Sequence, residues 1–220
     1  MRGVRVVLIG GTSNVGKSTV ARTVADRLGF ECLSTDGLAR HPGRPWRTPE
    51  KEVPAHVAEH YGTLGPDELI TSVLGHYERL WPRIEELITE RATGHGTGLV
   101  LEGSALWPAR VAELEVPHTA AVWLTADPAV VRARVHAAGG YASATTGERQ
   151  LMDAFLARTE RFQTLVLHAV GRWGLERIDV SGDRSVAELA DAVLAAADAQ
   201  NAVGRSSAGR GPGGTAVVEG

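Results

Sequence analysis

Eight consecutive residues near the N-terminus have the types and the spacing needed to hold the phosphates of a nucleotide. Residues 11–18 read Gly-Thr-Ser-Asn-Val-Gly-Lys-Ser and match Gly-x-x-x-x-Gly-Lys-Ser at every fixed position. Glycines let the backbone wrap a phosphate so that its N–H groups point inward, at the positive end of a helix dipole. In such a loop Lys17 reaches the β- and γ-phosphates, and the Ser18 hydroxyl is a ligand of Mg²⁺. The sequence therefore predicts a site for ATP and Mg²⁺, contacted by Gly11, Thr12, Ser13, Asn14, Val15, Gly16, Lys17, Ser18 and Thr19.

A phosphate loop of this kind joins a strand to a helix, and the flanking sequence predicts both. Residues 4–10 are a short apolar run, which is typical of a parallel strand buried on both faces. Residues 17–28 place their apolar side chains on one side of a helix, and Gly29 is suited to end it. This context disfavours the alternative that the motif is a chance glycine-rich turn.

Two acidic residues follow predicted strands, where ligands bind in open α/β sheets. Asp36 follows the strand at 30–34, and Glu102 follows the strand at 99–101. A kinase needs one carboxylate to orient or deprotonate the attacking hydroxyl and another acid to hold Mg²⁺ or its waters. Their positions favour Asp36 for the first role, at the acceptor, and Glu102 for the second, although the two could share or exchange roles. The alternative for Asp36 is an N-cap of a helix at 37–40.

The remaining pattern alternates strands with helices, which predicts an α/β fold with a parallel sheet and right-handed crossovers. Further strands are expected at residues 119–124 and 175–180. Helices are expected at residues 66–91, 127–136, 148–170 and 185–200, with Pro82 kinking or dividing the first. We expect one domain over residues 1–200 and a disordered tail at 201–220, because the tail is rich in Gly, Ser and Ala.

Arginines flank a segment of small residues at 137–147, which predicts a mobile lid over about residues 132–161. Arg132 and Arg134 precede the segment, and Arg158 and Arg161 follow it. Arginines on a closing lid can neutralise charge on the phosphoryl group during transfer. We expect Arg134 and Arg158 to act in catalysis and Arg132 and Arg134 to contact the nucleotide. The alternative for several of these arginines is a surface charge without a role in the site.

Several motifs resemble the small P-loop kinases that include chloramphenicol phosphotransferase and, more loosely, 2-phosphoglycerate kinase, gluconate kinase and zeta-toxin kinases. The resemblance rests on IGGTSNVGKST, TDGLAR and LVLEGS, and extends more weakly through TADPAVVRARV and IDVSGDRSVAEL. It implies a P-loop NTPase fold with a five-stranded parallel sheet in the order 2-3-1-4-5, a lid, and a helical acceptor-binding region at about residues 37–95. It also implies that Asp36 is the catalytic base, and that an adenine-contacting loop near residues 181–184 contributes Asp183 and Arg184.

One segment, HPGRPWRTPEKEVPAHVAEHYG at residues 41–62, departs from the family pattern and leaves the acceptor open. Basic and aromatic residues in and near it are candidates for an acceptor pocket that also includes Asp36 and Glu102. These candidates are Arg40, Arg44, Trp46, Arg47, Tyr61, Tyr77, Trp81 and Trp107. The arginines suit either an anionic acceptor or the ATP phosphates, and the aromatics suit either a ring-containing natural product or core packing.

Composition narrows the class of protein. The net charge of -3 argues against a general nucleic-acid binder, and no run of eighteen apolar residues predicts a membrane span. Residues 1–2 lead directly into an apolar strand, so we expect no signal peptide. The single cysteine, Cys32, cannot form an internal disulfide, and we expect a reducing cytoplasm. The oligomeric state stays open, with a homodimer as one possibility.

The combined pattern predicts an ATP-dependent kinase that phosphorylates a hydroxyl of a small molecule. No Asn-Lys-x-Asp guanine motif is present, and no long apolar strand ends in the acidic pair of a motor ATPase. An antibiotic or secondary metabolite is narrowly favoured as the acceptor over a central metabolite. The alternatives are a nucleotide kinase, a toxin-type sugar-nucleotide kinase and a non-catalytic nucleotide-dependent switch.

Overall fold

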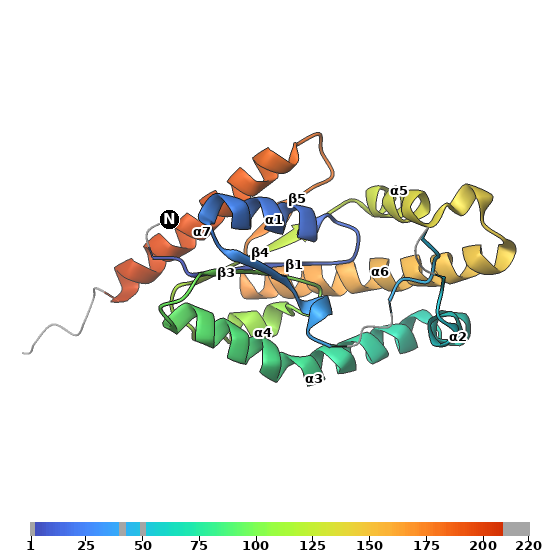
Figure 1. Ribbon diagram of the computed structural model, residues 1–220, viewed down its shortest axis with the longest axis horizontal. Coiled ribbons are helices and arrows are strands. Elements are labelled where there is room, and N and C mark those ends of the chain that lie inside the picture. The colour runs from blue at the N-terminus through green and yellow to red at the C-terminus, as the bar shows by residue number, and fades with distance from the viewer. Residues whose placement is uncertain (1–2, 40–42, 49–51, 209–220) are drawn as a thin grey trace, which may run out of the picture.

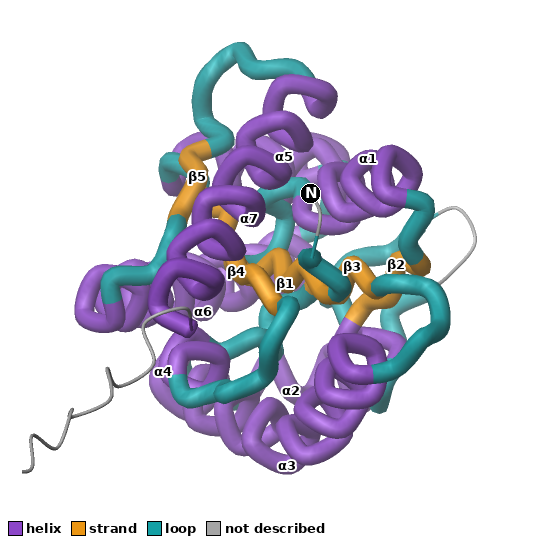
Figure 2. The backbone as a smooth tube through the Cα atoms, turned by 90° about the vertical axis from the view of Figure 1, so that its left-hand side faces the viewer, coloured by secondary structure: helices purple, strands orange, loops and turns teal. Residues whose placement is uncertain are grey.

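A parallel sheet of five strands forms the centre of the computed structural model, which describes residues 3–39, 43–48 and 52–208. Figure 2 shows the strands side by side in the order β2-β3-β1-β4-β5. Their bounds are β1 Val6–Gly11, β2 Glu31–Ser34, β3 Leu99–Glu102, β4 Thr119–Thr125 and β5 Arg177–Asp179. All four pairings between neighbouring strands are parallel. The order 2-3-1-4-5 that the resemblance implied is confirmed.

Helices cover both faces of this sheet (Figures 1 and 2). The helices are α1 Lys17–Leu28, α2 Ala55–Thr63, α3 Pro66–Thr93, α4 Pro108–Ala112, α5 Pro128–Gly139, α6 Thr146–Trp173 and α7 Val186–Ala208, with short 3₁₀ turns η1 Thr35–Gly37 and η2 Tyr141–Ser143. Helices α1 and α7 contact each other on one face, and α3, α4 and α6 lie on the other. Among the residues that the structure describes, every helix is too short or too polar to span a bilayer.

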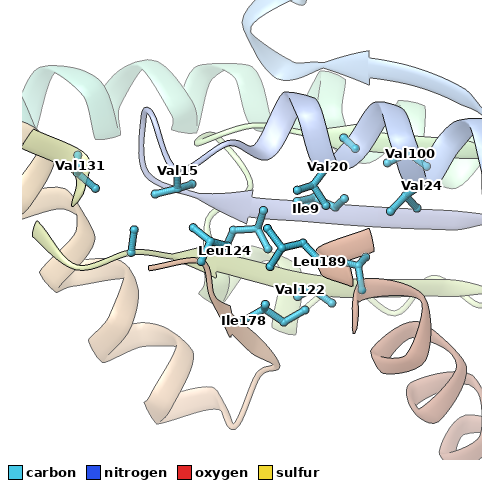
Figure 3. Packing of buried hydrophobic residues seen from close by; sticks show 14 of the residues in the cluster. Ile9, Val15, Val20, Val24, Val100, Val122, Leu124, Val131, Ile178 and Leu189 are labelled. Atoms are coloured by element: carbon cyan, nitrogen blue, oxygen red, sulfur yellow. The ribbon is translucent and has the colours of Figure 1, made fainter. Parts of the chain in front are cut away.

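Two hydrophobic clusters fix these layers, because alternate residues of a strand face opposite sides of a sheet. In β1, Val7 and Ile9 belong to the cluster beneath α1 and α7, whereas Val6 and Leu8 belong to the cluster against α3, α4 and α6. Figure 3 shows the first cluster, in which side chains of β1, β4, α1 and α7 meet. Because both faces of β1 are buried, the loop that follows it is anchored firmly.

The structure gives the bounds of three expected features and corrects two of the expectations, at Pro82 and at the end of α7. Pro82 does not divide helix α3, because buried side chains on both sides of the proline hold one continuous helix against the sheet. The segment at residues 137–147, within the expected lid, contains the end of α5, the turn η2 and the start of α6. Helix α7, expected to end near residue 200, continues to Ala208, so it extends into the segment expected to be tail. Residues 209–220 lie outside the described residues.

Two glutamine side chains complete the hydrogen bonding of β4 where its short neighbour β5 does not reach. The Gln200 amide accepts from the Ala121 N–H at 3.0 Å and donates to the Ala121 carbonyl at 2.9 Å. At the other end, Gln163 makes the same pair of bonds with the backbone of Ala126. Buried backbone groups must find partners, so these amides replace a missing stretch of strand.

We expect Gln200→Ala to lower the free energy of unfolding by about 1–3 kcal/mol, because it leaves two part-buried backbone groups of Ala121 unpaired. Urea unfolding measures the effect. The matched control is Gln150→Ala on the exposed surface of α6, which should leave the midpoint unchanged. Equal urea midpoints for both variants would show that the two hydrogen bonds between Gln200 and Ala121 contribute nothing to stability.

Candidate active site

The phosphate loop leaves β1 through backbone conformations that only glycine adopts readily. Gly11 has φ 128° and Gly16 has φ 95°, both in the region that L side chains avoid. A Cβ at Gly11 would lie 2.2 Å from the carbonyl oxygen of Leu124, so any larger residue would push β1 away from β4. Asn14 is also left-handed, at φ 61°. These positions explain the glycine spacing of the motif in structural terms.

The N-terminus of α1 offers free N–H groups to an anion. Its N-cap is Gly16, which has no side chain to accept hydrogen bonds, and the first turn contains no acidic residue. The first N–H groups of a helix lack partners inside the helix and carry the positive end of its dipole. This end of α1 therefore suits a phosphate or another anion.

Lys17 is only 8% exposed and points into the loop rather than into solvent. Its Nζ donates to the Thr12 carbonyl at 2.7 Å and to Ser104 Oγ at 3.3 Å. Burial lowers the pKa of Lys17, and the carboxylates of Glu102 and Asp36 oppose that shift. A phosphate group beside Lys17 would stabilise its charged form further.

Ser18 and Glu102 meet at the carboxyl edge of the sheet. The Ser18 hydroxyl donates to Glu102 Oε1 at 2.8 Å, and Glu102 is 5% exposed. A hydroxyl and a carboxylate beside a phosphate site form the small oxygen donor set that Mg²⁺ uses together with phosphate oxygens and waters. The residues present therefore fit Mg²⁺.

Asp36 lies in the 3₁₀ turn that follows β2, and its carboxylate does not cap that turn. The N-cap of this turn is Ser34, whose hydroxyl accepts from the Asp36 N–H at 3.3 Å. Asp36 therefore does not act as the cap, which was the alternative interpretation of this residue. Within the described part of the chain, its carboxylate accepts no hydrogen bond and lines the same pocket as Lys17 and Glu102.

A pocket of about 610 Å³ lies over the loop and brings the main candidates together. The predicted residues that line it are Ser13, Asn14, Gly16, Lys17, Ser18, Thr19, Asp36, Arg44, Tyr77, Glu102 and Arg134. The sequence did not single out five others, namely Arg22, Gly43, Gly103, Ser104 and Phe155. Of these, Ser104 was within reach of sequence reasoning, because it closes the LVLEGS motif at the end of a strand.

The candidate lid arginines have different surroundings. Arg134 lines the pocket and donates to the Asn14 carbonyl at 3.3 Å. Arg132 pairs with Glu160 at 2.6 Å, and Arg161 lies 3.5 Å from Asp67. Arg134 thus lies at the phosphate loop, whereas Arg132 and Arg161 form surface ion pairs with α6 and α3.

Most of the candidate aromatic residues pack in the core. Trp46 is buried and meets Phe155 edge-on, and Tyr61 also lies against Phe155. Trp81 and Trp107 line a separate cavity of about 110 Å³, which shares Tyr77 with the main pocket. Core packing therefore describes Trp46 and Tyr61, and Tyr77 is the candidate aromatic that faces the loop.

The other predicted contacts lie away from the phosphate loop. Arg47 is 3.4 Å from Glu148 on the outer part of α6. Arg184 donates to the Asp179 carbonyl, and Asp183 is exposed in the same turn after β5. Arg40 falls outside the described residues. None of these three described residues lines the main pocket.

Comparisons with known proteins find this architecture repeated in kinases. Neither a protein-family model nor a curated protein sequence matches the chain. A solved sugar kinase from Janibacter sp. HTCC2649 matches 91% of this chain and 98% of its own, with a TM-score of 0.52 and 22% identity. A gluconokinase from Sinorhizobium meliloti 1021 matches 91% of this chain and 95% of its own, with a TM-score of 0.50 and 18% identity. The chain has the fold of the small P-loop kinases.

Proposed function

We propose that the chain transfers the γ-phosphate of ATP to a hydroxyl group of a small molecule. The observation that carries this proposal is the pocket in which a phosphate loop and an unengaged carboxylate, Asp36, face each other. A nucleotide-dependent switch needs the loop but has no use for a free carboxylate at the acceptor position. The transfer reaction needs both.

In the proposed reaction, an acceptor hydroxyl oxygen attacks the γ-phosphorus while Asp36 takes the hydroxyl proton. A new P–O bond forms, and the bond between the γ-phosphorus and the β,γ-bridging oxygen breaks, with its electrons leaving on ADP. Lys17 and the free N–H groups of α1 stabilise the charge of the phosphate oxygens. Arg134, beside the phosphate loop, adds a further positive charge.

Mg²⁺ would be held by Ser18 and, directly or through water, by Glu102. When bound, it neutralises charge on the β- and γ-phosphates. The hydrogen bond between Ser18 and Glu102 supports this assignment because it already places the two oxygen donors together.

The lining of the pocket favours a compact polar acceptor over a bulky ring-containing natural product. The aromatic lining of the pocket consists of Tyr77 and Phe155, since Trp46 and Tyr61 are packed in the core. The remaining lining is largely polar or charged. This weakens the preference for an antibiotic and favours a small hydroxylated metabolite.

An acceptor screen tests the proposal. The protein would be incubated with ATP, Mg²⁺ and a library of hydroxylated metabolites, antibiotics, nucleosides and sugar nucleotides, and mass spectrometry would score the gain of one phosphate. We expect transfer to at least one compact hydroxylated compound. Nucleotide binding without transfer to any acceptor would instead favour the switch.

We expect Glu102→Gln to raise the Mg²⁺ concentration for half-maximal turnover by roughly ten- to a hundredfold. The amide keeps the shape of the side chain but loses the negative charge next to Ser18. A magnesium titration of the ATP-dependent rate measures this, with Glu115→Gln on the exposed surface as the matched control. An unchanged magnesium requirement would remove Glu102 from the metal site.

A further inference from the structure

Arg158 of α6 is a buried cation without an acidic partner among the described residues. Only 5% of the residue is exposed, and its Nε is buried with no hydrogen-bond partner. Half-buried arginines elsewhere have partners: Arg91 pairs with Glu31 at 2.5 Å, and the Nε of Arg149 donates to the Tyr141 carbonyl at 3.0 Å. Because a guanidinium stays protonated in proteins, Arg158 keeps its positive charge in the interior.

Aromatic ring faces hold this guanidinium in place. The Cζ of Arg158 lies 4.7 Å from the ring centre of Phe155 and 6.0 Å from that of Tyr61. Ring faces attract a cation through their quadrupole but do not neutralise it. The arrangement therefore fixes the position of the charge and leaves the Nε–H, which has no partner among the described residues, available to an anion.

The neighbouring contacts place Arg158 between the phosphate loop and the helices of the acceptor region. The Thr12 hydroxyl of the loop donates to the carbonyl of Thr159, the residue after Arg158. On the other side, Tyr61 belongs to α2, and Phe155 lines the main pocket. Arg134, in contrast, touches the loop directly through Asn14.

Charge effects agree with this placement. Burial raises the pKa of Tyr77 to about 12, and Arg158 is the strongest charge that opposes the rise. The positive charges of Arg44 and Arg158 also contribute to the lowered pKa of Lys17, after burial itself. Arg158 is thus near both the Tyr77 wall of the pocket and the lysine that faces the phosphates.

We propose that Arg158 receives an anionic group on the acceptor, so that the substrate is a hydroxy acid or a phosphorylated hydroxy compound. A carboxylate or phosphate binds a guanidinium through two parallel N–H···O bonds and would supply the missing counter-charge. Such a contact would fix one end of the acceptor and help to orient its hydroxyl toward Asp36. The claim that the bound anion is the phosphate acceptor rests on the proposed kinase activity. The claim that Arg158 binds an anion does not.

Matched pairs of compounds test the substrate class. The wild-type protein with ATP and Mg²⁺ would be offered gluconate with sorbitol, glycerate with glycerol, glycerol 3-phosphate with glycerol, and further acids and phosphates each with its uncharged counterpart. We expect transfer to the anionic member of a pair, and the carboxylate and phosphate pairs distinguish the two possible groups. Equal transfer to the uncharged members would overturn the proposal.

The variant Arg158→Gln separates a role toward the acceptor from a role toward ATP. We expect it to raise the KM of the anionic acceptor by about a hundredfold, which is the loss expected for a charge-assisted bond, while the KM of ATP changes less than twofold. Arg158→Lys should recover part of the affinity, and Arg172→Gln on the exposed surface of the same helix, α6, serves as the control. A change confined to the KM of ATP would assign Arg158 to the nucleotide and overturn the proposal.

A binding measurement decides the inference even if no compound accepts phosphate. In that case the proposed function has failed, and the same anions are titrated calorimetrically into the protein saturated with Mg²⁺ and ADP. Binding of a carboxylate or phosphate compound that is lost in Arg158→Gln, with thermal unfolding of the variant unchanged, supports the anion site. The absence of binding by every anionic probe overturns it.

Discussion

Replacing Lys17 with alanine is expected to reduce phosphate transfer by on the order of a thousandfold or more, which is the scale for removing one preorganised charge from a transition state. Lys17 Nζ lies inside the phosphate loop, against the Thr12 carbonyl and the Ser104 hydroxyl. The other two cations of α1, Arg22 and Arg27, are exposed rather than buried inside the loop. The rate of ADP formation with an accepted substrate measures the loss.

The fold should survive this substitution, although Lys17 is buried. Burial already disfavours its charged form and lowers its pKa, so removing the charge should not lower the thermal midpoint. Arg27→Ala, at the far end of the same helix, removes a cation that pairs with Asp191 on the surface and should leave transfer intact. Normal turnover by a folded Lys17→Ala protein would contradict the role of the phosphate loop.

The parts of the site that could be predicted from the sequence are those set by local pattern. The glycine spacing of the loop follows from backbone angles at Gly11 and Gly16, and a spacing is visible in a linear sequence. Asp36 and Glu102 could be found because Asp36 follows β2 and Glu102 is the last residue of β3, and strands of a parallel sheet end at one edge. The element type and the strand boundaries follow from hydrophobic periodicity in the same way.

What the sequence did not predict depends on contacts between distant segments. Whether Trp46 faces a ligand or the core is decided by Phe155, more than a hundred residues away, which meets it edge-on. The extension of α7 to Ala208 gains a tertiary anchor from Gln200, whose partner Ala121 lies in β4. The lack of an acidic partner for Arg158 among the described residues likewise depends on tertiary structure, because it follows from how α2 and α6 lie side by side.

Replacing Asp36 with asparagine is expected to lower turnover by roughly two to four orders of magnitude while nucleotide affinity changes little. Asparagine retains the size of the side chain but cannot take the proton of the acceptor hydroxyl. Asp36 supplies no cap and accepts no described hydrogen bond, so the fold should be unaffected. Single-turnover rates with a saturating acceptor, together with fluorescence titration of an ATP analogue, separate the chemical step from binding.

The two carboxylates can be told apart by comparing Asp36→Asn with Glu102→Gln in the same assays. Asp26→Asn, an exposed acid on α1, controls for the loss of one negative charge. If Asp36→Asn altered the magnesium requirement and Glu102→Gln removed the chemical step, the two roles would be exchanged and the kinase proposal would stand. If neither variant slowed transfer, the pocket over the phosphate loop would not be the place where the acceptor hydroxyl is activated. Among the described residues, the Asp36 carboxylate neither caps a helix nor forms an ion pair, and it lines the pocket. This favours Asp36 as the base and Glu102 as the metal ligand.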